Sequence, residues 1–329
     1  MARVVRFHEH GGPEVLRIED INIPKPDRGE VRIHVKALGL NRAEALLRSG
    51  NYIETPAFPS GLGLEAAGIV ETVGEGVRDI VPGDAVSIVP PVSMVRWPAY
   101  GELVTFPAAF VVKHPPSFSW ETAAAMWMQY LTAYGALIDI AKLHRNDFVV
   151  ITAASSSVGL AAIQIANMVG ATPIAVTRTS FKKNALLSHG AAHVIASAEE
   201  NLESRLKEIT GPDGVRVVLD PVGGPIFEPL TAAMSRGGIL IEYGGLSPDP
   251  TPFPLFAVLS KVLTLRGYLV HEIIGDPARL EAAKAFILDG LMSGALKPVI
   301  AKTFPFDQIV EAHRFLESNE QFGKIVVTV

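Results

Sequence analysis

The chain has 329 residues, of which 48% are apolar and 19% charged, a composition typical of a globular protein with a sizeable core and about two domains. The 29 Lys and Arg residues against 34 Asp and Glu give a net charge of −5, which offers no basic surface for nucleic acid or an anionic membrane. Cysteine is absent, which excludes disulfides, thiol catalysis and thiolate metal ligands.

The N-terminus lacks the pattern of a secretory leader, because Arg3 and Arg6 interrupt any apolar run. The most apolar stretch, residues 158–177, contains Gln164 and Pro173, so it predicts a helix, a turn and a strand rather than a membrane span. We therefore expect a cytoplasmic protein with neither a membrane nor a nucleic acid as partner.

The first 120 or so residues have the pattern of a β-rich domain. Short β-branched runs between Gly, Pro and Asp predict strands over residues 3–7, 30–37, 69–73 and 85–89. Several glycines between positions 61 and 76 indicate bends in a distorted sheet or barrel.

Near Trp120 the pattern changes to regular alternation of helices and strands. Ser119 is a candidate N-cap for a helix over residues 121–141. Five apolar strands follow, with helices that end at glycines between them; the strands are predicted at residues 148–152, 174–176, 193–196, 215–219 and 239–243, and the helices at 158–169, 181–189, 201–209 and 226–235. Strands that are apolar throughout indicate a doubly wound α/β domain, with a parallel sheet covered on both faces. Residues 258–270 are a candidate sixth strand, and residues 279–292 predict an amphipathic helix.

The loop after the first of these strands predicts a dinucleotide phosphate site. Residues 148–159 lead from the strand through small residues into a helix, with Ala153, Ser156 and Gly159 where such loops carry glycine. Small residues let a pyrophosphate approach the backbone amides at the helix N-terminus. The candidate phosphate contacts are Ser155, Ser156, Ser157, Val158 and Gly159. An ordinary N-cap is the alternative interpretation; a nucleophile elbow is excluded, because alanine stands at its first glycine.

The end of the second strand favours NADP(H) over NAD(H). An acidic residue at this place would bind a ribose 2′-hydroxyl, but the sequence has Thr177, Arg178 and Lys182 instead. A guanidinium and an ammonium suit a 2′-phosphate. The alternative is that both charges are only solvated.

Several different motifs follow one another along the chain, each occurring once. They include Phe7-His-Glu-His-Gly-Gly-Pro-Glu-Val-Leu16, Gly39-Leu-Asn-Arg-Ala-Glu44 and the phosphate loop, together with residues 59–68, 131–134 and 218–224. With both halves in view, the chain resembles the medium-chain dehydrogenase/reductase superfamily, specifically its zinc-free quinone oxidoreductase branch, the zeta-crystallin-like proteins. The resemblance implies a discontinuous GroES-like catalytic domain, formed by residues 1–122 and 268–329, and a Rossmann cofactor-binding domain over residues 123–267. It also implies a homodimer joined through the edge of the cofactor-domain sheet, for which residues 258–270 are the candidate.

The resemblance also implies chemistry without a metal. Zinc-using relatives carry Cys and His ligands where this chain has Asn41 and Leu64. In the family, the residues that match Asn41 and Tyr52 face the nicotinamide; one offers an amide donor and the other a hydroxyl that can act as a donor or acid. A turn residue and a packing aromatic are the alternatives for these two positions. By the same matching, the further cofactor contacts are Thr132, Tyr243, Gly244 and Lys324.

The function implied is that of an NADPH-dependent, metal-independent oxidoreductase. It would transfer a hydride to quinones or activated alkenes such as enones and enals, and its substrate would be a small hydrophobic electrophile, selected by residues 90–98 and by the loop around Tyr52. Two alternatives stay open. One is an alcohol dehydrogenase or carbonyl reductase of the same superfamily, and the other is a catalytically idle NADPH-binding protein, structural or RNA-binding, although the net charge argues against RNA.

Overall fold

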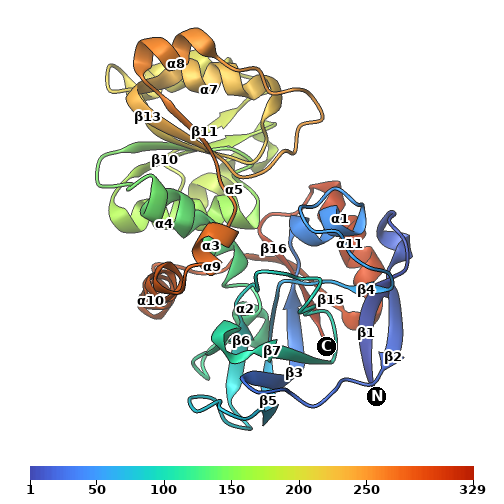
Figure 1. Cartoon of the computed structure of the whole chain (residues 1–329). Helices are drawn as coiled ribbons and strands as arrows, with labels where there is room; N and C mark the ends of the chain where they lie inside the picture. Colours follow the sequence, from blue (N-terminus) through green and yellow to red (C-terminus); the bar gives the residue numbers. More distant parts are fainter. The chain divides into compact units, whose positions relative to one another are not determined.

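The chain folds as two units, each with its own core, and the computed structural model describes every residue from Met1 to Val329 (Figure 1). Unit 1 comprises Met1–Met128 and Pro298–Val329, and unit 2 comprises Gln129–Lys297. The segment 268–297, which the family resemblance places in the catalytic domain, belongs to unit 2. Its helix α10 (Pro277–Ser293) is held there by Arg279, whose Nε donates to Asp139 at 3.0 Å.

Unit 2 is built on a six-stranded parallel sheet, which confirms the doubly wound α/β fold. The strand order is β11-β10-β9-β12-β13-β14, so the order reverses between β9 and β12. The strands are β9 (Phe148–Ile151), β10 (Thr172–Thr177), β11 (His193–Ala196), β12 (Val215–Asp220), β13 (Met234–Glu242) and β14 (Thr264–Gly267). In such sheets ligands bind at the carboxyl ends of the strands, beside the point of reversal.

Helices cover both faces of this sheet; Figure 1 shows α4 and α5 on one side and α7 and α8 on the other. The helices are α4 (Ser157–Val169), α5 (Lys183–Ser188), α6 (Leu202–Thr210), α7 (Phe227–Ala233) and α8 (Leu255–Lys261), followed by α9 (His271–Ile274). Val150, Ile174 and Val218 are fully buried, because a central parallel strand is covered on both sides. None of the helices is both long and apolar enough to span a lipid bilayer.

The predicted helix over residues 121–141 is wrong as a single element. The structure has α2 (Trp120–Ala123), α3 (Met128–Tyr134) and a π-helical turn over Gly135–Ile140. Ser119 caps α2 as predicted, since its hydroxyl accepts from the amide of Thr122 at 3.2 Å. The helix breaks because a buried carboxylate, that of Glu65, accepts from the amides of Trp127 and Met128 and so starts a new helix there.

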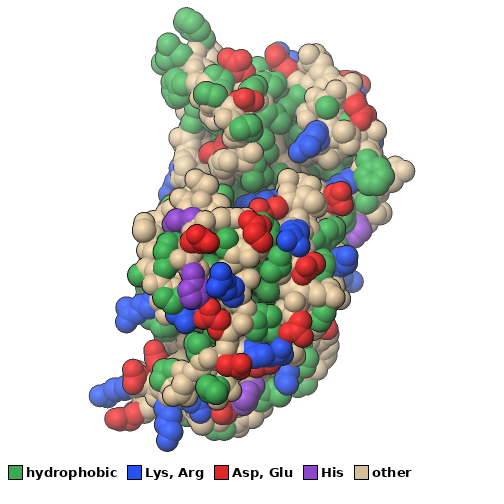
Figure 2. Space-filling model, turned by 90° about the vertical axis from the view of Figure 1, so that its right-hand side faces the viewer, with side chains coloured by type: hydrophobic (Ala, Val, Ile, Leu, Met, Phe, Trp, Pro, Cys, Tyr) green, Lys and Arg blue, Asp and Glu red, His purple; other side chains and the backbone are tan.

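The predicted strand over residues 258–270 is wrong in its first half. Residues up to Lys261 form α8, and only Thr264–Gly267 join the sheet, as β14. Ala257 and Val258 pack against the core of unit 2, and Lys261 donates to the carbonyl of Ala232 at 2.6 Å. The rest of α8 is apolar but exposed, and Figure 2 shows hydrophobic side chains protruding at the end of unit 2 that carries α8 in Figure 1.

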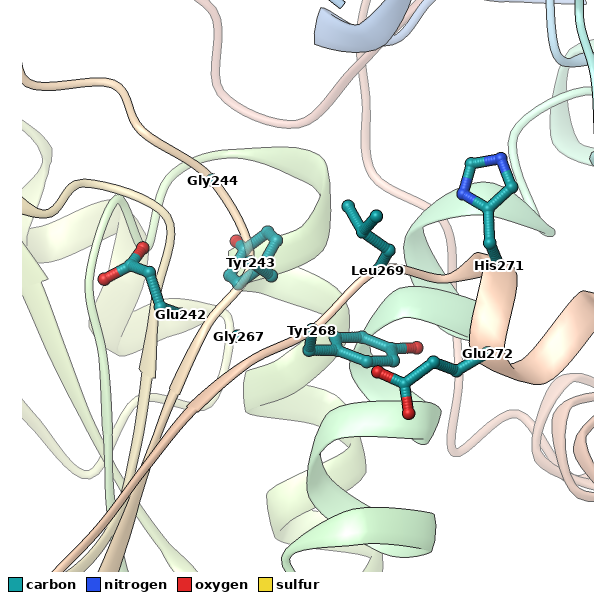
Figure 3. A pocket seen from close by; sticks show the side chains of 8 residues that line it. All are labelled: Glu242, Tyr243, Gly244, Gly267, Tyr268, Leu269, His271 and Glu272. Carbon is teal, nitrogen blue, oxygen red and sulfur yellow. The ribbon is translucent and has the colours of Figure 1, made fainter. Parts of the chain in front are cut away.

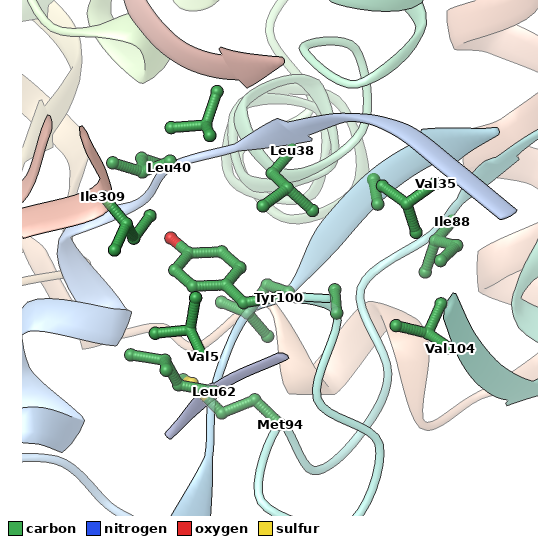
Figure 4. Close-up of a cluster of buried hydrophobic side chains, with 14 of the residues drawn as sticks. Val5, Val35, Leu38, Leu40, Leu62, Ile88, Met94, Tyr100, Val104 and Ile309 are labelled. Carbon is green, nitrogen blue, oxygen red and sulfur yellow. The ribbon is translucent and has the colours of Figure 1, made fainter. Parts of the chain in front are cut away.

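Unit 1 is β-rich, as predicted, with one three-stranded sheet in the order β2-β1-β4 and one seven-stranded sheet in the order β15-β16-β3-β5-β6-β8, to which β7 adds by pairing with β3. The strands are β1 (Ala2–Phe7), β2 (Arg17–Ile21), β3 (Glu30–Gly39), β4 (Ser60–Gly61), β5 (Glu65–Val73), β6 (Ala85–Ile88), β7 (Leu103–Pro107), β8 (Val111–Lys113), β15 (Ile300–Pro305) and β16 (Lys324–Thr328), and the helices are α1 (Arg42–Arg48) and α11 (Ile309–Ser318). Tyr100 lies in the core among Val5, Leu40, Leu62 and Ile309 (Figure 4).

Candidate functional site

The loop between β9 and α4 has the geometry of a phosphate site. Ser156 is the N-cap of α4, and its hydroxyl accepts from the amide of Gly159 at 3.0 Å. Gly159 admits no side chain, because a Cβ there would lie 2.6 Å from the carbonyl oxygen of Ala154. The amides of the first helical turn have no partners inside the helix, and they carry the positive end of its dipole. This end of the sheet is therefore suited to an anion.

Ala153, at the start of this loop, has a φ of 44°, in the left-handed region that favours glycine. The sequence has alanine where related loops have glycine, and the backbone keeps the glycine conformation nonetheless. Such strain persists where the surroundings require one backbone path. The turn that brings the helix N-terminus beside the strand is therefore kept at some cost in stability.

The two predicted cationic residues lie beside this loop in different ways. The Nζ of Lys182 donates to the hydroxyl of Ser155 at 3.3 Å, which brings the segment after β10 against the phosphate loop. Arg178 is exposed, and the carbonyl of Thr177 is used inside the unit, where it accepts from the amide of Ser197 at 2.9 Å. A cation in contact with the loop and a second one in solvent after the same strand suit a phosphorylated ribose.

Tyr243 follows β13 and connects this strand end to the phosphate loop. Its hydroxyl interacts with the side chain of Ser156. Burial, followed by the charges of Asp220 and Glu242, raises the pKa of Tyr243 well above its usual value. The predicted residues Ser155, Ser156, Lys182 and Tyr243 therefore lie together at the carboxyl edge of the sheet, with Lys182 in contact with Ser155 and Tyr243 close to Ser156.

A pair of carboxyl groups lies at the same edge, at the ends of β12 and β13. Asp220 and Glu242 are register partners. Asp220 is fully buried and accepts from the amides of Val222 and Gly223, each at 3.0 Å, and from the hydroxyl of Thr152. Neither carboxyl oxygen of Glu242 has a hydrogen-bond partner. Burial and the neighbouring Asp220 raise the pKa of Glu242 to about 9, so this carboxyl is protonated at neutral pH.

A cavity of about 730 Å³ opens beside this edge, between the ends of β13 and β14 (Figure 3). Tyr268 and Leu269 lie on one side of it, next to His271 and Glu272 at the start of α9, while the carboxyl of Glu242 points away from them. The cavity is lined by Glu242, Tyr243, Gly244, Gly267, Tyr268, Leu269, His271 and Glu272. Its volume falls in the range of small-molecule and cofactor sites.

Unit 1 contains a different kind of polar cluster, centred on Asn41. Asn41 is the N-cap of α1, and Glu44 completes a capping box: the amide of Asn41 donates to Glu44 at 2.7 Å. The Nδ2 of Asn41 also donates to Glu44, at 3.1 Å, and its Oδ1 accepts from the Nζ of Lys324 at 2.6 Å. Both ends of the Asn41 amide are therefore engaged inside unit 1.

Lys324, at the start of β16, is the charge at the centre of this cluster. It forms an ion pair with Glu65, and both side chains are fully buried. Glu65 also accepts from the amides of Trp127 and Met128, at 3.2 and 3.0 Å, so each group has its partners, as buried charges require. Glu44, the other buried carboxyl group of the cluster, has a raised pKa. Burial raises it to about 7, although the charge of Lys324 opposes this shift.

Tyr52 lies on the loop that follows α1, where it is partly buried and packs against the core of unit 1. Burial, and then the charges of Glu54 and Glu44, raise the pKa of Tyr52 above its usual value. The hydroxyl is therefore protonated throughout the physiological range and can act as a hydrogen-bond donor. Its predicted catalytic role stays a prediction.

The predicted site residues are divided between the two units. Asn41, Tyr52 and Lys324 belong to unit 1, and the other predicted residues belong to unit 2. Thr132 is buried in α3. Gly244 is exposed, but a side chain there would be crowded, because its Cβ would lie 2.9 Å from the carbonyl oxygen of Pro221.

Sequence analysis missed Glu65, Asp220 and Glu242 as functional candidates. Each had a signal: Glu65 directly follows Leu64, which stands where zinc-using relatives carry a histidine ligand, and the two other carboxylates stand at strand ends of the sheet. No group of three or more His, Asp or Glu side chains among residues 1–329 converges in a way that could hold a metal ion.

Two family models match the chain, one in each unit. A family model described as "alcohol dehydrogenase GroES-like domain" matches residues 27–116, and one described as "zinc-binding dehydrogenase" matches residues 157–288. Quinone oxidoreductase 1 of Escherichia coli is 34% identical over 98% of both chains, and human quinone oxidoreductase is 30% identical over 99% of this chain and 98% of its own. The crystal structure of E. coli quinone oxidoreductase complexed with NADPH has a TM-score of 0.90 and 33% identity, and covers 99% of this chain and 100% of its own. The resemblance inferred from sequence is thereby confirmed: the chain belongs to the medium-chain dehydrogenase/reductase superfamily and, within it, to the quinone oxidoreductases.

Proposed function

We propose that the chain is an NADPH-dependent oxidoreductase that reduces quinones or activated alkenes without a catalytic metal. The observation that carries the cofactor assignment is the contact between Lys182 and Ser155, which joins a cation to the phosphate loop beside the exposed Arg178. The relatives named quinone oxidoreductase, and the similar structure that holds NADPH, support the same conclusion.

The residues of unit 2 fit this cofactor. Gly159 lets the loop fold tightly against the start of α4, because any Cβ there would collide with the backbone of Ala154, and the first turn of α4 supplies amides for a pyrophosphate. Ser155, Ser156 and Ser157 supply hydroxyl donors, and Lys182 and Arg178 supply positive charge for a 2′-phosphate. Tyr243 and Gly244 border the cavity that would receive a part of NADPH beyond its phosphates. When bound, NADPH supplies a hydride.

The residues of unit 1 suit the other half of the reaction, the stabilisation of negative charge on an acceptor oxygen. The raised pKa of Tyr52 keeps a proton on its hydroxyl, so the hydroxyl can donate a hydrogen bond to a developing enolate. Lys324 and Glu44 hold the amide of Asn41 in one orientation. Positioning and hydrogen bonding are the two means of catalysis available to such residues.

The test is an NADPH-oxidation screen over quinones, enones, enals and ketones, preceded by a fluorescence titration of NADPH against the purified protein. We expect saturable NADPH binding and turnover with quinones or activated alkenes. Turnover restricted to ketones or alcohols, and abolished by EDTA, would favour an alcohol dehydrogenase. Binding without turnover of any acceptor would favour the catalytically idle alternative.

We also propose that a second copy of the chain covers the edge of the unit 2 sheet. β14 is the last strand of that sheet, and an uncovered edge beside apolar residues favours association with another chain. Large apolar side chains next to it are exposed, among them Phe256 at 83% and Leu259 at 65%. We expect a dimer in solution by light scattering, and dissociation in Phe256→Glu/Leu259→Glu. Met292→Glu, which places one negative charge at an exposed apolar position of α10, is the control for each single substitution, Phe256→Glu and Leu259→Glu.

A further inference from the structure

Two loops of unit 1 are joined by the side chain of Glu54. The first loop, residues 51–59, follows α1, and the second, residues 90–98, lies between β6 and β7. One carboxyl oxygen of Glu54 accepts from the amide of Met94 at 3.2 Å, and the other accepts from the hydroxyl of Ser93. A single carboxylate therefore connects two segments that are about 40 residues apart in the sequence.

The second loop is firmly anchored at the point where Glu54 binds it. Met94 is fully buried in the core of unit 1. The hydroxyl of Ser93 accepts from the amide of Arg96 at 3.1 Å, and the Arg96 guanidinium lies over the ring of Trp97, 4.4 Å from its centre. These contacts make residues 93–97 a closed turn, so the carboxylate of Glu54 binds to a fixed support.

The first loop has fewer anchors of its own. It contains no strand or helix between Asn51 and Pro59. The ring of Phe58 packs against those of Phe7 and His10 at one end, whereas Ile53, next to Glu54, is exposed by 58%. Tyr52 and the buried Pro56 pack against the body of unit 1, and Glu54 lies between them in the sequence. Glu54 is the residue through which this loop bonds to the second one.

Tyr52, the proposed donor, is two residues from Glu54. The two groups are close enough for the charge of Glu54 to act on the tyrosine hydroxyl. Apolar residues stand on either side of the link: Ile53 on the first loop and Val92, exposed by 41%, on the second. Exposed apolar side chains on both loops suit an apolar acceptor.

We propose that Glu54 is a positioning residue that holds the Tyr52 loop against residues 90–98 and thereby sets the size of the acceptor that Tyr52 can serve. The inference rests on the proposed function. With the link intact, the two loops keep a fixed separation, and we expect this to favour small quinones. Without it, the loop moves away, small acceptors lose their orientation and larger ring systems are admitted.

The experiment compares Glu54→Ala, Glu54→Gln and Ser93→Ala with the unaltered chain, using 1,4-benzoquinone as the small acceptor and 9,10-phenanthrenequinone as the large one. We expect Glu54→Ala to raise KM for benzoquinone by about tenfold, a typical effect of losing a charge-assisted hydrogen bond, and to shift the preference toward the large quinone. Glu54→Gln should restore most of the preference, because its amide oxygen still accepts from Met94. Ser93→Ala should give a smaller shift in the same direction.

The controls separate positioning from loss of structure. The dissociation constant of NADPH should change by less than about twofold in all variants. Glu75→Ala removes an exposed glutamate elsewhere in unit 1 and should change neither quinone's KM. In hydrogen exchange, the amide of Met94 should exchange faster in Glu54→Ala than in the unaltered chain.

The outcomes distinguish the inference from the function on which it rests. If the unaltered chain oxidises NADPH with none of the acceptors tested, the proposed function is overturned, and this inference with it. Normal turnover by the unaltered chain, together with an unchanged ratio of the two quinones in Glu54→Ala, would overturn the inference alone. Equal losses for both quinones, accompanied by weaker NADPH binding, would likewise contradict it, because they would indicate a general structural defect.

Discussion

The polar residues of unit 1 and those of unit 2 are arranged in opposite ways. In unit 1, Asn41, Glu65 and Lys324 are buried and bind one another, so their hydrogen-bonding groups are used inside the protein. In unit 2, the phosphate loop presents its helix N-terminus and hydroxyls at a strand end, and Arg178 extends into solvent. The cluster of unit 1 thus fixes the orientation of the Asn41 amide by internal pairing, whereas the loop of unit 2 keeps its groups available to a ligand.

The largest effect is expected from breaking the unit 1 cluster. Lys324→Met leaves the Glu65 carboxylate buried without its counter-ion, which typically costs about 3–5 kcal/mol of unfolding free energy. Urea denaturation measures the loss. Adding Glu65→Gln should recover part of it, because the uncompensated charge is gone. Lys36→Met, at an exposed position on β3, should be nearly neutral, and a loss below about 1 kcal/mol in Lys324→Met would contradict the role of the ion pair.

The second largest effect is expected at Arg178, beside the phosphate loop of unit 2. Arg178→Ala should weaken NADPH binding by about 10- to 100-fold while the affinity for NADH stays within about twofold, because only NADPH carries the 2′-phosphate. Fluorescence titration with both cofactors measures the difference. Arg145→Ala, an exposed arginine ahead of β9, is the matched control. Equal losses with both cofactors would remove Arg178 from 2′-phosphate recognition.

A third prediction concerns Glu242, which is partly buried in unit 2 but lacks the partners that Glu65 has. Its folded-state pKa of about 9 lies above the ordinary value of 4.5, so the folded chain keeps a proton that the unfolded chain releases. The contribution to stability is fully present below pH 4.5 and is lost as the pH rises toward 9.

Glu242→Gln should remove this pH dependence. Between pH 6 and pH 9 the unaltered chain should lose about 1–2 kcal/mol more than the variant, after allowance for solvent screening of a partly exposed group. Thermal unfolding at the two pH values measures the difference. Parallel losses in both proteins would show that Glu242 is not the group responsible.

The smallest effect tests the strain in the phosphate loop. Ala153→Gly should stabilise the protein by about 0.5–1 kcal/mol, because glycine adopts the φ of 44° without a steric penalty. Ala154→Gly, at the adjacent buried position, should destabilise it by about 1 kcal/mol, since flexibility is added where no strain is relieved. Denaturant midpoints of the pair decide the matter; a loss of stability in both would mean that position 153 is unstrained.

The doubly wound domain could be predicted from sequence because its signals are local. Apolar runs such as residues 148–151 and glycines such as Gly170 recur at helical and strand spacing, and a buried parallel strand has to be apolar along its whole length. The phosphate loop was equally evident, since a close approach of backbone to anion demands small residues at fixed positions. Both features depend on neighbours in the chain.

The polar network of unit 1 and the boundary of unit 2 depended on contacts that no local pattern records. Glu65 meets Lys324 across a separation of 259 residues, and the same carboxylate interrupts the helix that composition predicts over residues 121–141. Residues 255–261 are apolar enough for a strand, yet they form α8, because one face packs on unit 2 and Lys261 bonds to carbonyls of α7. The order of apolar and small residues along the chain thus determined the fold class and the loop; tertiary packing alone decided which buried charges meet, since their energy depends on distance in space rather than in sequence.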